Sequence, residues 1–313
     1  MEELLPVLGQ TGPFFAIVAL GWGAAARGFW PDEATGWLTR FVFYFALSAM
    51  LFGFAARLDF ADIWNGPLAL AYLAGTGSVY LLATLVALAR GRGVEEAAIE
   101  AQASAIGNVG FLGVPLVGMM LGLKAVGVVM LVLSVDLVVF GSLIVIIVSL
   151  KRGSRPGIGL FADVAGGLMR NPMIVSIALG LAWSASGWAL PAPADRFLTI
   201  LGGAATPGAL FAIGASLAGR SAERLGPALW LSALKLIGHP AAVLAAIVLT
   251  GVPLTAHHAV AVAAAAMPTA GNVYILARHW NIAPRRASAT ILVSTVASVL
   301  TLTATLAWVT TLP

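Results

Sequence analysis

Apolar residues along this chain form long continuous runs that are separated by short polar segments. Ten runs carry few or no formal charges, and most reach the roughly 20 residues that a helix needs to cross the hydrocarbon core of a membrane. The runs are residues 4–26, 41–56, 63–89, 101–123, 125–150, 171–194, 197–219, 225–256, 259–277 and 287–313. Apolar and polar residues do not alternate within them, which indicates helices rather than strands. The pattern predicts an all-α membrane protein with ten transmembrane helices.

The first run lacks the organisation of a signal peptide. Glu2 and Glu3 precede it, where a signal peptide carries basic residues, and the apolar stretch itself is long. We therefore expect residues 4–26 to form a helix of the mature protein.

Basic residues are concentrated in alternate loops between the ten runs. One set of loops holds Arg57, Lys124 and Arg196, and the other holds Arg27, Arg40, Arg90, Arg92, Lys151, Arg152, Arg155, Arg170, Arg220, Arg224, Arg278, Arg285 and Arg286. Loops rich in Lys and Arg face the cytoplasm. The distribution predicts an inner-membrane protein with both termini on the extracytoplasmic side.

The composition excludes several classes of protein. Of the 313 residues, 60% are hydrophobic and only 10% are charged, whereas soluble domains carry about 25% charged residues. The net charge of +4 comes from basic residues that are dispersed between apolar runs, so nucleic acid is not an expected partner and membrane lipid is. Without cysteine, the chain has no disulfide and no Cys-ligated zinc.

The two halves of the chain share a series of short matches in the same order. Gly-Asn-Val occurs at 107–109 and again at 271–273. Earlier matches in this series pair Gly21 with Gly180 and Phe52 with Phe211. A cytoplasmic linker at 151–170 separates a predicted five-helix repeat in 1–150 from a second one in 171–313. Because five is an odd number, the second repeat is inverted in the membrane, an organisation typical of secondary transporters.

Both repeats place Gly, Asn and Pro in the middle of a predicted helix. The residues are Gly107, Asn108, Gly110 and Pro115 in the fourth run, and Pro268, Thr269, Gly271, Asn272 and Tyr274 in the ninth. Pro lacks a backbone donor and Gly weakens a helix, so we expect both helices to break, with Pro115 and Pro268 as the helix-breaking residues. Freed backbone groups must then line a protein cavity. The alternative is that the glycines only allow close helix packing, with each Asn bonded between helices.

Three ionisable residues interrupt the apolar runs. Asp136 lies in the fifth run, and Lys235 and His239 lie in the eighth. A buried charge costs roughly 2.5–3.5 kcal/mol on insertion scales, so these groups must pair, face water or be neutral. One interpretation is a structural ion pair between Lys235 and Asp136, and another is that Lys235 extends to the membrane surface. The functional interpretation is that Asp136 exchanges a proton and Lys235 attracts an anion, while His239 is an ordinary hydrogen-bonded helix residue.

Motifs for catalysis or metal binding do not stand out in the sequence. We find no His, Asp and Glu cluster with metal-ligand spacing, no Ser-His-Asp arrangement and no phosphate-binding loop. A membrane-embedded hydrolase would need paired carboxylates, a metal motif or a nucleophile with its base. We therefore expect no enzymatic activity, no cofactor and no metal.

Several motifs resemble those of the auxin efflux carrier family, which includes the plant PIN-FORMED carriers and bacterial malonate or organic-acid permeases. The sequence Asn-Val-Gly-Phe-Leu-Gly-Val-Pro at 108–115 is similar to the family's fourth-helix motif. Residues 213–217, 234–240 and 268–281 are similar to its seventh, eighth and ninth helices. The resemblance extends over essentially the whole chain.

The resemblance implies the fold of bile acid:sodium symporters and sodium/proton antiporters. Helices one, two, six and seven would form a scaffold that also makes a homodimer. Helices three to five and eight to ten would form a mobile core in which the broken fourth and ninth helices cross. The family's substrate-binding asparagines fall on Asn108 and Asn272. Pro115 follows its Asn, whereas Pro268 precedes its Asn, so we expect the two breaks to differ in geometry.

These observations together predict a secondary transporter of small organic anions, expected to be carboxylates, that works by alternating access. Substrate would contact the residues of the two breaks and Lys235, while Asp136 and Lys235 are the candidates for coupling to a proton or to sodium. The alternative is a sodium-coupled symporter of larger amphipathic acids. Such a site needs several oxygen ligands near the breaks, and the break segments contain no Asp or Glu. A channel and a membrane-embedded enzyme are less favoured alternatives.

Overall fold

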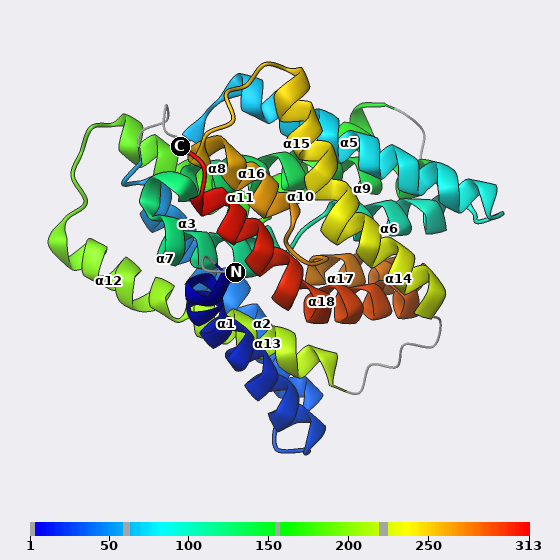
Figure 1. Cartoon of the computed structure of the whole chain (residues 1–313), viewed down its shortest axis with the longest axis horizontal. Coiled ribbons are helices and arrows are strands. Elements are labelled where there is room, and N and C mark those ends of the chain that lie inside the picture. The colour runs from blue at the N-terminus through cyan, green and yellow to red at the C-terminus, as the bar shows by residue number, and fades with distance from the viewer. Residues whose placement is uncertain (1–3, 59–62, 154–156, 219–224) are drawn as a thin grey trace. The chain divides into compact units, whose positions relative to one another are not determined.

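The computed structural model describes residues 4–58, 63–153, 157–218 and 225–313 (Figure 1). Within these residues every regular element is helical, and β-type pairing is confined to an isolated bridge between Gly107 and Thr269. The all-α fold that the continuous apolar runs predict is therefore confirmed.

Six helical runs in the described parts of the chain are long and apolar enough to cross a membrane. They are α2–α3 (Asp32–Ala55), α5 (Gly66–Ala89), α8–α9 (Leu123–Lys151), α12–α13 (Ala192–Leu217), α14–α15 (Gly226–Leu249) and α18 (Pro284–Thr310). The bent pair α10 (Ile158–Met169) and α11 (Pro172–Ala185) makes a seventh candidate. Shorter apolar stretches are Thr11–Ala26 within α1 (Leu4–Ala26), Val109–Leu121, which ends in α7 (Val114–Leu121), and α16 (Ala256–Ala265). The chain is a multi-pass membrane protein, and the number of ten transmembrane helices stays a prediction.

The stretch predicted as a cytoplasmic linker, 151–170, is largely helical. Helix α10 occupies residues Ile158–Met169. The linker was predicted from the charged residues, which stand mainly at the two ends of the stretch. The residues between them are mostly apolar, and Ile158 and Phe161 are exposed. The side chain of Asn171 then accepts a hydrogen bond from the N–H of Met173 and so caps the start of α11.

The chain divides into two compact units, and the first is built from three separate segments, Met1–Asn65, Val109–Leu131 and Met169–Gly219. Its elements are α1, α2 (Asp32–Phe41), η1 (Val42–Ala46), α3 (Leu47–Ala55), η2 (Val109–Gly113), α7, α11, α12 (Ala192–Gly203) and α13 (Ala205–Leu217). Elements labelled η are short π-helical segments. The unit therefore combines helices from both halves of the sequence.

Glycines allow very close helix contacts in the first unit. A Cβ on Gly21 of α1 would lie 2.2 Å from the carbonyl oxygen of Phe211 in α13. A Cβ on Gly180 of α11 would lie 2.7 Å from the carbonyl oxygen of Phe52 in α3. Gly21 corresponds to Gly180 in the sequence repeat, and Phe52 corresponds to Phe211. The two contacts are thus the same contact with the two halves of the sequence exchanged.

The second unit consists of Gly66–Asn108, Val132–Leu168 and Arg220–Pro313. Its elements are α5, α6 (Val94–Ala105), η3 (Asp136–Phe140), α9 (Gly141–Lys151), α10, α14 (Leu225–Ala233), η4 (Leu234–Gly238), α15 (His239–Leu249), α16, α17 (Gly271–Trp280) and α18, while α8 (Leu123–Val135) runs across the boundary between the units. A core of small and branched apolar residues joins α5, α6, α9 and α17. Gly75 allows α5 to lie against the backbone of Val243 in α15.

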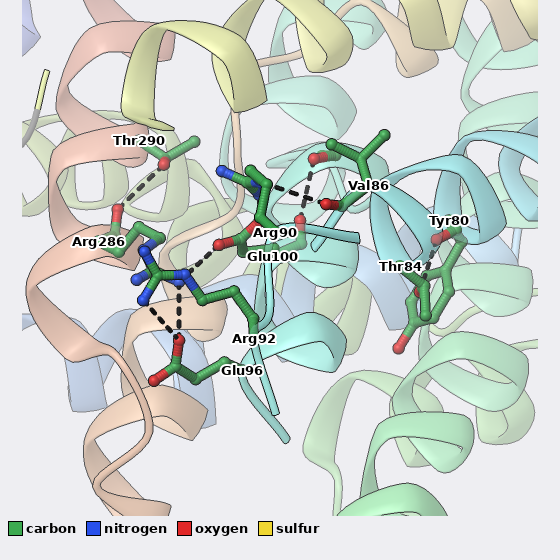
Figure 2. A network of polar contacts seen from close by, with 10 residues as sticks. Tyr80, Thr84, Val86, Arg90, Arg92, Glu96, Glu100, Arg286 and Thr290 are labelled. Carbon is green, nitrogen blue, oxygen red and sulfur yellow. Dashed lines mark hydrogen bonds and ion pairs between the residues drawn. The ribbon is translucent and has the colours of Figure 1, made fainter. Parts of the chain in front are cut away.

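An ion-pair network holds the start of α6 in the second unit (Figure 2). The Glu100 side chain is fully buried, and its two oxygens accept hydrogen bonds from different residues, Arg90 and Arg286. Arg286 also pairs with Glu96 at 3.2 Å, and Arg92 lies 3.9 Å from the same carboxylate. The apolar run alone placed Glu100 outside the fourth helix. The structure instead buries it within α6, because the two arginines compensate its charge.

Candidate substrate site

Helices α6 and α16 both end inside the second unit, at Ala105 and Ala265. Non-helical segments follow, directly after α6 at 106–108 and after a turn beyond α16 at 268–270, and these two segments, called here the paired segments, bind one another. The N–H of Asn108 donates to the carbonyl of Pro268 at 2.7 Å, and the N–H of Ala270 donates to the carbonyl of Ile106 at 3.0 Å. Backbone groups that lipid would leave unsatisfied therefore bind each other. Helix α17 begins directly after the second segment, at Gly271.

Thr269 fastens the paired segments to two neighbouring helices. Its hydroxyl donates to the carbonyl of Ala103 in α6 at 2.7 Å, and its N–H donates to the Ser294 hydroxyl in α18 at 3.1 Å. The residue is buried. The contact of Thr269 with substrate stays a prediction, and in the structure its polar groups hold the paired segments in place.

The two asparagines occupy different local structures, as the unequal spacing of their prolines led us to expect. Asn108 lies in an extended segment and is 7% exposed, whereas Asn272 lies in the first turn of α17 and is exposed. Over the residues that the structure describes, neither side-chain amide makes a hydrogen bond. Both amides are therefore available to a ligand. The packing alternative, in which each Asn is bonded between helices, is not what the structure shows.

Three further predicted residues have distinct surroundings. Gly107 is closely packed, since a Cβ there would lie 3.2 Å from both the Lys235 Nζ and the carbonyl oxygen of Ala264. Gly271 has no atom within 4 Å of such a Cβ, so its backbone is open. Tyr274 follows in α17 and is partly exposed.

Two predicted residues of the fourth helix lie outside the second unit. Gly110 is in η2 and Pro115 is in α7, and both belong to the first unit. The prediction that Pro115 breaks the helix is wrong. The break lies before Val109, and helical structure continues through Pro115, because a proline is tolerated near the start of a helix, where its missing N–H is not needed.

Lys235 is fully buried in η4, and its ammonium lies at the C-terminal end of α16. Its Nζ donates to the carbonyl of Ala265, the last residue of α16, and lies 3.0 Å from the Nδ1 of His239. Carbonyls at a helix C-terminus lack intrahelical donors and form the negative end of the helix dipole, so a cation is favourable there. The interpretation that Lys235 extends to the membrane surface is wrong, because the side chain has no exposed surface.

Asp136 is the first residue of η3 and is also buried. Its Oδ1 accepts a hydrogen bond from the Tyr72 hydroxyl at 2.9 Å, while Oδ2 has no hydrogen-bond partner among the described residues. Within the same residues, no ion pair of 4 Å or less joins Asp136 to Lys235. The structure therefore does not support the structural ion pair as an explanation of both residues.

Hydrogen bonds connect the neighbourhoods of Lys235 and Asp136 to two residues of α5 that lie one helical turn apart. The Nε2 of His239 lies 2.9 Å from the hydroxyl of Thr76 in α5, and Tyr72 stands one helical turn before Thr76. We call Lys235, His239, Thr76, Tyr72 and Asp136 the buried polar chain. Lys235 and Asp136 both lie in π-helical segments, which are rare and occur often at functional sites.

Among the described residues, no group of three or more His, Asp or Glu residues could hold a metal ion.

Comparison with known proteins identifies the family. A family model described as membrane transport protein matches residues 6–156 and 162–306. The chain belongs to this family, the auxin efflux carriers. It is also 31% identical over 300 residues to a Rhizobium meliloti (strain 1021) protein named "Putative malonate transporter", with 95% of this chain and 94% of that protein covered. Both similarities indicate a membrane transporter rather than an enzyme. They confirm the predicted auxin efflux carrier family and the prediction that the chain is not an enzyme.

Three residues that the sequence analysis did not single out take part in these contacts. Tyr72 and Thr76 complete the buried polar chain, and Glu100 closes the ion-pair network. One signal was present in the sequence, since Tyr72 and Thr76 are polar residues four apart in an otherwise apolar run. Residues four apart share one face of a helix. What they contact was not predictable, because His239 follows Thr76 by 163 residues.

Proposed function

We propose that this chain transports small organic anions with carboxylate groups, such as malonate, by alternating access. The observation that carries the proposal is the pair of free asparagine amides, Asn108 and Asn272, at two breaks whose backbones are hydrogen-bonded to each other. The name of the similar Rhizobium meliloti protein supplies malonate as the first compound to test.

The second break offers a carboxylate more than one donor. Helix α17 starts at Gly271, so its first N–H groups have no intrahelical acceptors and carry the positive end of the helix dipole. Gly271 adds no side chain that would cover them, and Asn272 is exposed beside it. Helix N-termini at broken helices bind anionic substrate groups in other secondary transporters. In our proposal the Asn amides and these N–H groups bind the carboxylate together.

Lys235 acts on the substrate through its charge rather than by contact. Its ammonium is held by Ala265 and His239, so it raises the positive potential at the paired segments without leaving its place. In low-dielectric surroundings a fixed charge acts over a longer range than in water. Lys235 and Asp136 are the residues that we propose for coupling transport to an ion.

Two five-helix repeats of opposite orientation are the architecture that we propose for the whole chain. The exchanged glycine contacts, Gly21 with Phe211 and Gly180 with Phe52, support it, because a two-fold relation between the repeats produces each contact twice. In this proposal the first unit corresponds to the scaffold and the second to the mobile core. The remaining parts of the proposal are dimerisation through the scaffold and extracytoplasmic termini.

Exchange of radiolabelled malonate across proteoliposomes that contain the purified protein tests this function without any ion gradient. Asn108→Ala and Asn272→Ala are each expected to reduce exchange at least tenfold, because the carboxylate loses a hydrogen-bond donor that a site built to bind it requires. Expression and thermal stability should stay close to wild type.

Asn281→Gly is the matched control, because it removes an amide outside the site. Asn281 ends α17 in the left-handed region with φ of 57°, a conformation that Gly adopts freely. Exchange at the wild-type rate in both site variants would remove the asparagines from the binding site. Absence of exchange of malonate and of other mono- and dicarboxylates in the wild type would refute the proposed substrate class.

A further inference from the structure

The Lys235 side chain occupies a position at which other transporters with broken helices bind a coupling cation. In sodium-coupled transporters with broken helices, unwound carbonyls and helix C-termini coordinate the Na⁺ ion. At the C-terminal end of α16 this chain instead places the Lys235 ammonium on the Ala265 carbonyl. The paired segments contain no Asp or Glu that would add oxygen ligands for sodium. A tethered cation at this point removes the electrostatic need for a bound one.

Lys235 and His239 together hold one positive charge. Their Nζ and Nδ1 atoms lie 3.0 Å apart, and both side chains are fully buried. Two adjacent cations repel strongly in a buried site, so the ammonium donates to an imidazole that is neutral. The imidazole then carries its own proton on Nε2, directed at the Thr76 hydroxyl. This arrangement fixes which nitrogen of His239 accepts and holds the ammonium in place.

Asp136 is the acid in the buried polar chain that can offset this charge. It is held through Tyr72, and its Oδ2 has no hydrogen-bond partner in the described part of the protein, which leaves that oxygen able to take a proton. Other titratable or charged groups on the elements packed against η3, η4 and α15 are Tyr80, His257, His258, Glu95, Glu96, Glu100, Arg285, Arg286 and Lys151. Of these groups, Glu100 is already bound by Arg90 and Arg286.

We infer that the buried polar chain is a proton-binding site and that the proton, not sodium, is the coupling ion of this transporter. When Asp136 is ionised, its charge offsets the positive charge of the Lys235–His239 pair, and a carboxylate gains little by approaching. When Asp136 Oδ2 takes a proton from water, the positive charge is unopposed and a carboxylate binds. One proton therefore enters with one carboxylate charge. The inference rests on the proposed transport of organic anions.

Net malonate uptake into proteoliposomes tests the coupling ion, with the membrane potential clamped and either a pH gradient or a sodium gradient imposed. We expect uptake to follow the pH gradient and to be unchanged when sodium is replaced by choline. Binding linked to one proton should change the apparent malonate affinity by up to about tenfold per pH unit. Asp136→Asn is expected to lose the part of this pH dependence that exceeds the titration of malonate itself.

Two further variants keep the test decisive if Asp136→Asn does not fold. Tyr72→Phe removes one hydrogen bond to the carboxylate and should displace the pH dependence of uptake toward higher pH. His239→Leu removes the acceptor that fixes the ammonium and should weaken the apparent malonate affinity at least tenfold. His279→Leu is the matched control, because His279 is exposed near the end of α17 and lies outside the buried polar chain.

The outcomes separate this inference from the proposed function. Malonate exchange in the wild type together with uptake driven by sodium and indifferent to pH would overturn proton coupling and leave the substrate class intact. If no carboxylate is exchanged, infrared spectroscopy still tests the proton site without transport. A protonated-carboxyl band that appears on acidification in the wild type and is missing in Asp136→Asn supports the site, and its absence from the wild type refutes it.

Discussion

Individual residues of the site differ in how far their roles could be predicted. Asp136 and Lys235 were recognisable because a charge inside an apolar run must have a partner or a function. The residues that hold them, Tyr72 and His239, became visible only in three dimensions. A hydrogen bond to Ala265 depends on where α16 ends, and local sequence does not determine that contact.

At Gly107 the absence of a side chain makes room for the Lys235 ammonium. A Cβ there would lie 3.2 Å from Nζ and 3.3 Å from the Cβ of Met267. Gly107→Ala is therefore expected to lower the stability of the folded protein by roughly 1–3 kcal/mol, the usual cost of overpacking. The thermal unfolding midpoint of the purified protein in detergent measures the effect.

Gly271→Ala provides the comparison for that measurement, since nothing lies within 4 Å of its added methyl group. Its unfolding midpoint should stay within the scatter of the wild type. If both variants unfold at the wild-type temperature, the close approach of Lys235 to Gly107 is wrong.

At the scale of the helices, the sequence predicted helix positions best where apolar residues were continuous and unpaired charges were few. The prediction of 63–89 as a helix corresponds to α5, and the prediction of 4–26 to α1. The prediction from apolar runs failed at α6, which begins at Val94 and carries Glu95, Glu96 and Glu100. Acidic residues in a first turn favour a helix start, but apolarity alone does not reveal that arginines from other helices permit a buried carboxylate.

The buried carboxylate of Glu100 anchors α6 to the ends of α5 and α18. Glu100→Gln leaves two guanidinium groups without this counter-charge and is expected to destabilise the protein by about 3–5 kcal/mol, as breaking a buried pair does. Glu96→Gln should cost no more than about 1 kcal/mol, because the Glu96 side chain is 38% exposed and water screens its pairs. Chemical or thermal unfolding compares the two variants. Equal losses would show that burial of Glu100 does not set its contribution.

For the molecule as a whole, the orientation in the membrane can be tested with single cysteines, because the chain has none of its own. Lys124 and Lys151 are both exposed and lie at or near the two ends of the helical run Leu123–Lys151. The distribution of basic residues predicts that Lys124 faces outward and Lys151 faces the cytoplasm.

A membrane-impermeant maleimide should therefore label Lys124→Cys in intact cells and label Lys151→Cys only after the cells are permeabilised. The reverse labelling pattern would show that the whole topology is opposite to the predicted one, including the side on which the termini lie. Labelling of both in intact cells would mean that Leu123–Lys151 does not cross the membrane.

The ion-pair network also constrains how the protein is made. Glu100 follows Arg90 closely in the chain, but its second arginine, Arg286, is synthesised 186 residues later. Until that residue leaves the ribosome, α6 carries a carboxylate that is only half compensated and is costly to bury in lipid. We therefore expect α6 to reach its final position only after Arg286 of α18 has been synthesised, so that this network forms late in the biogenesis of the second unit.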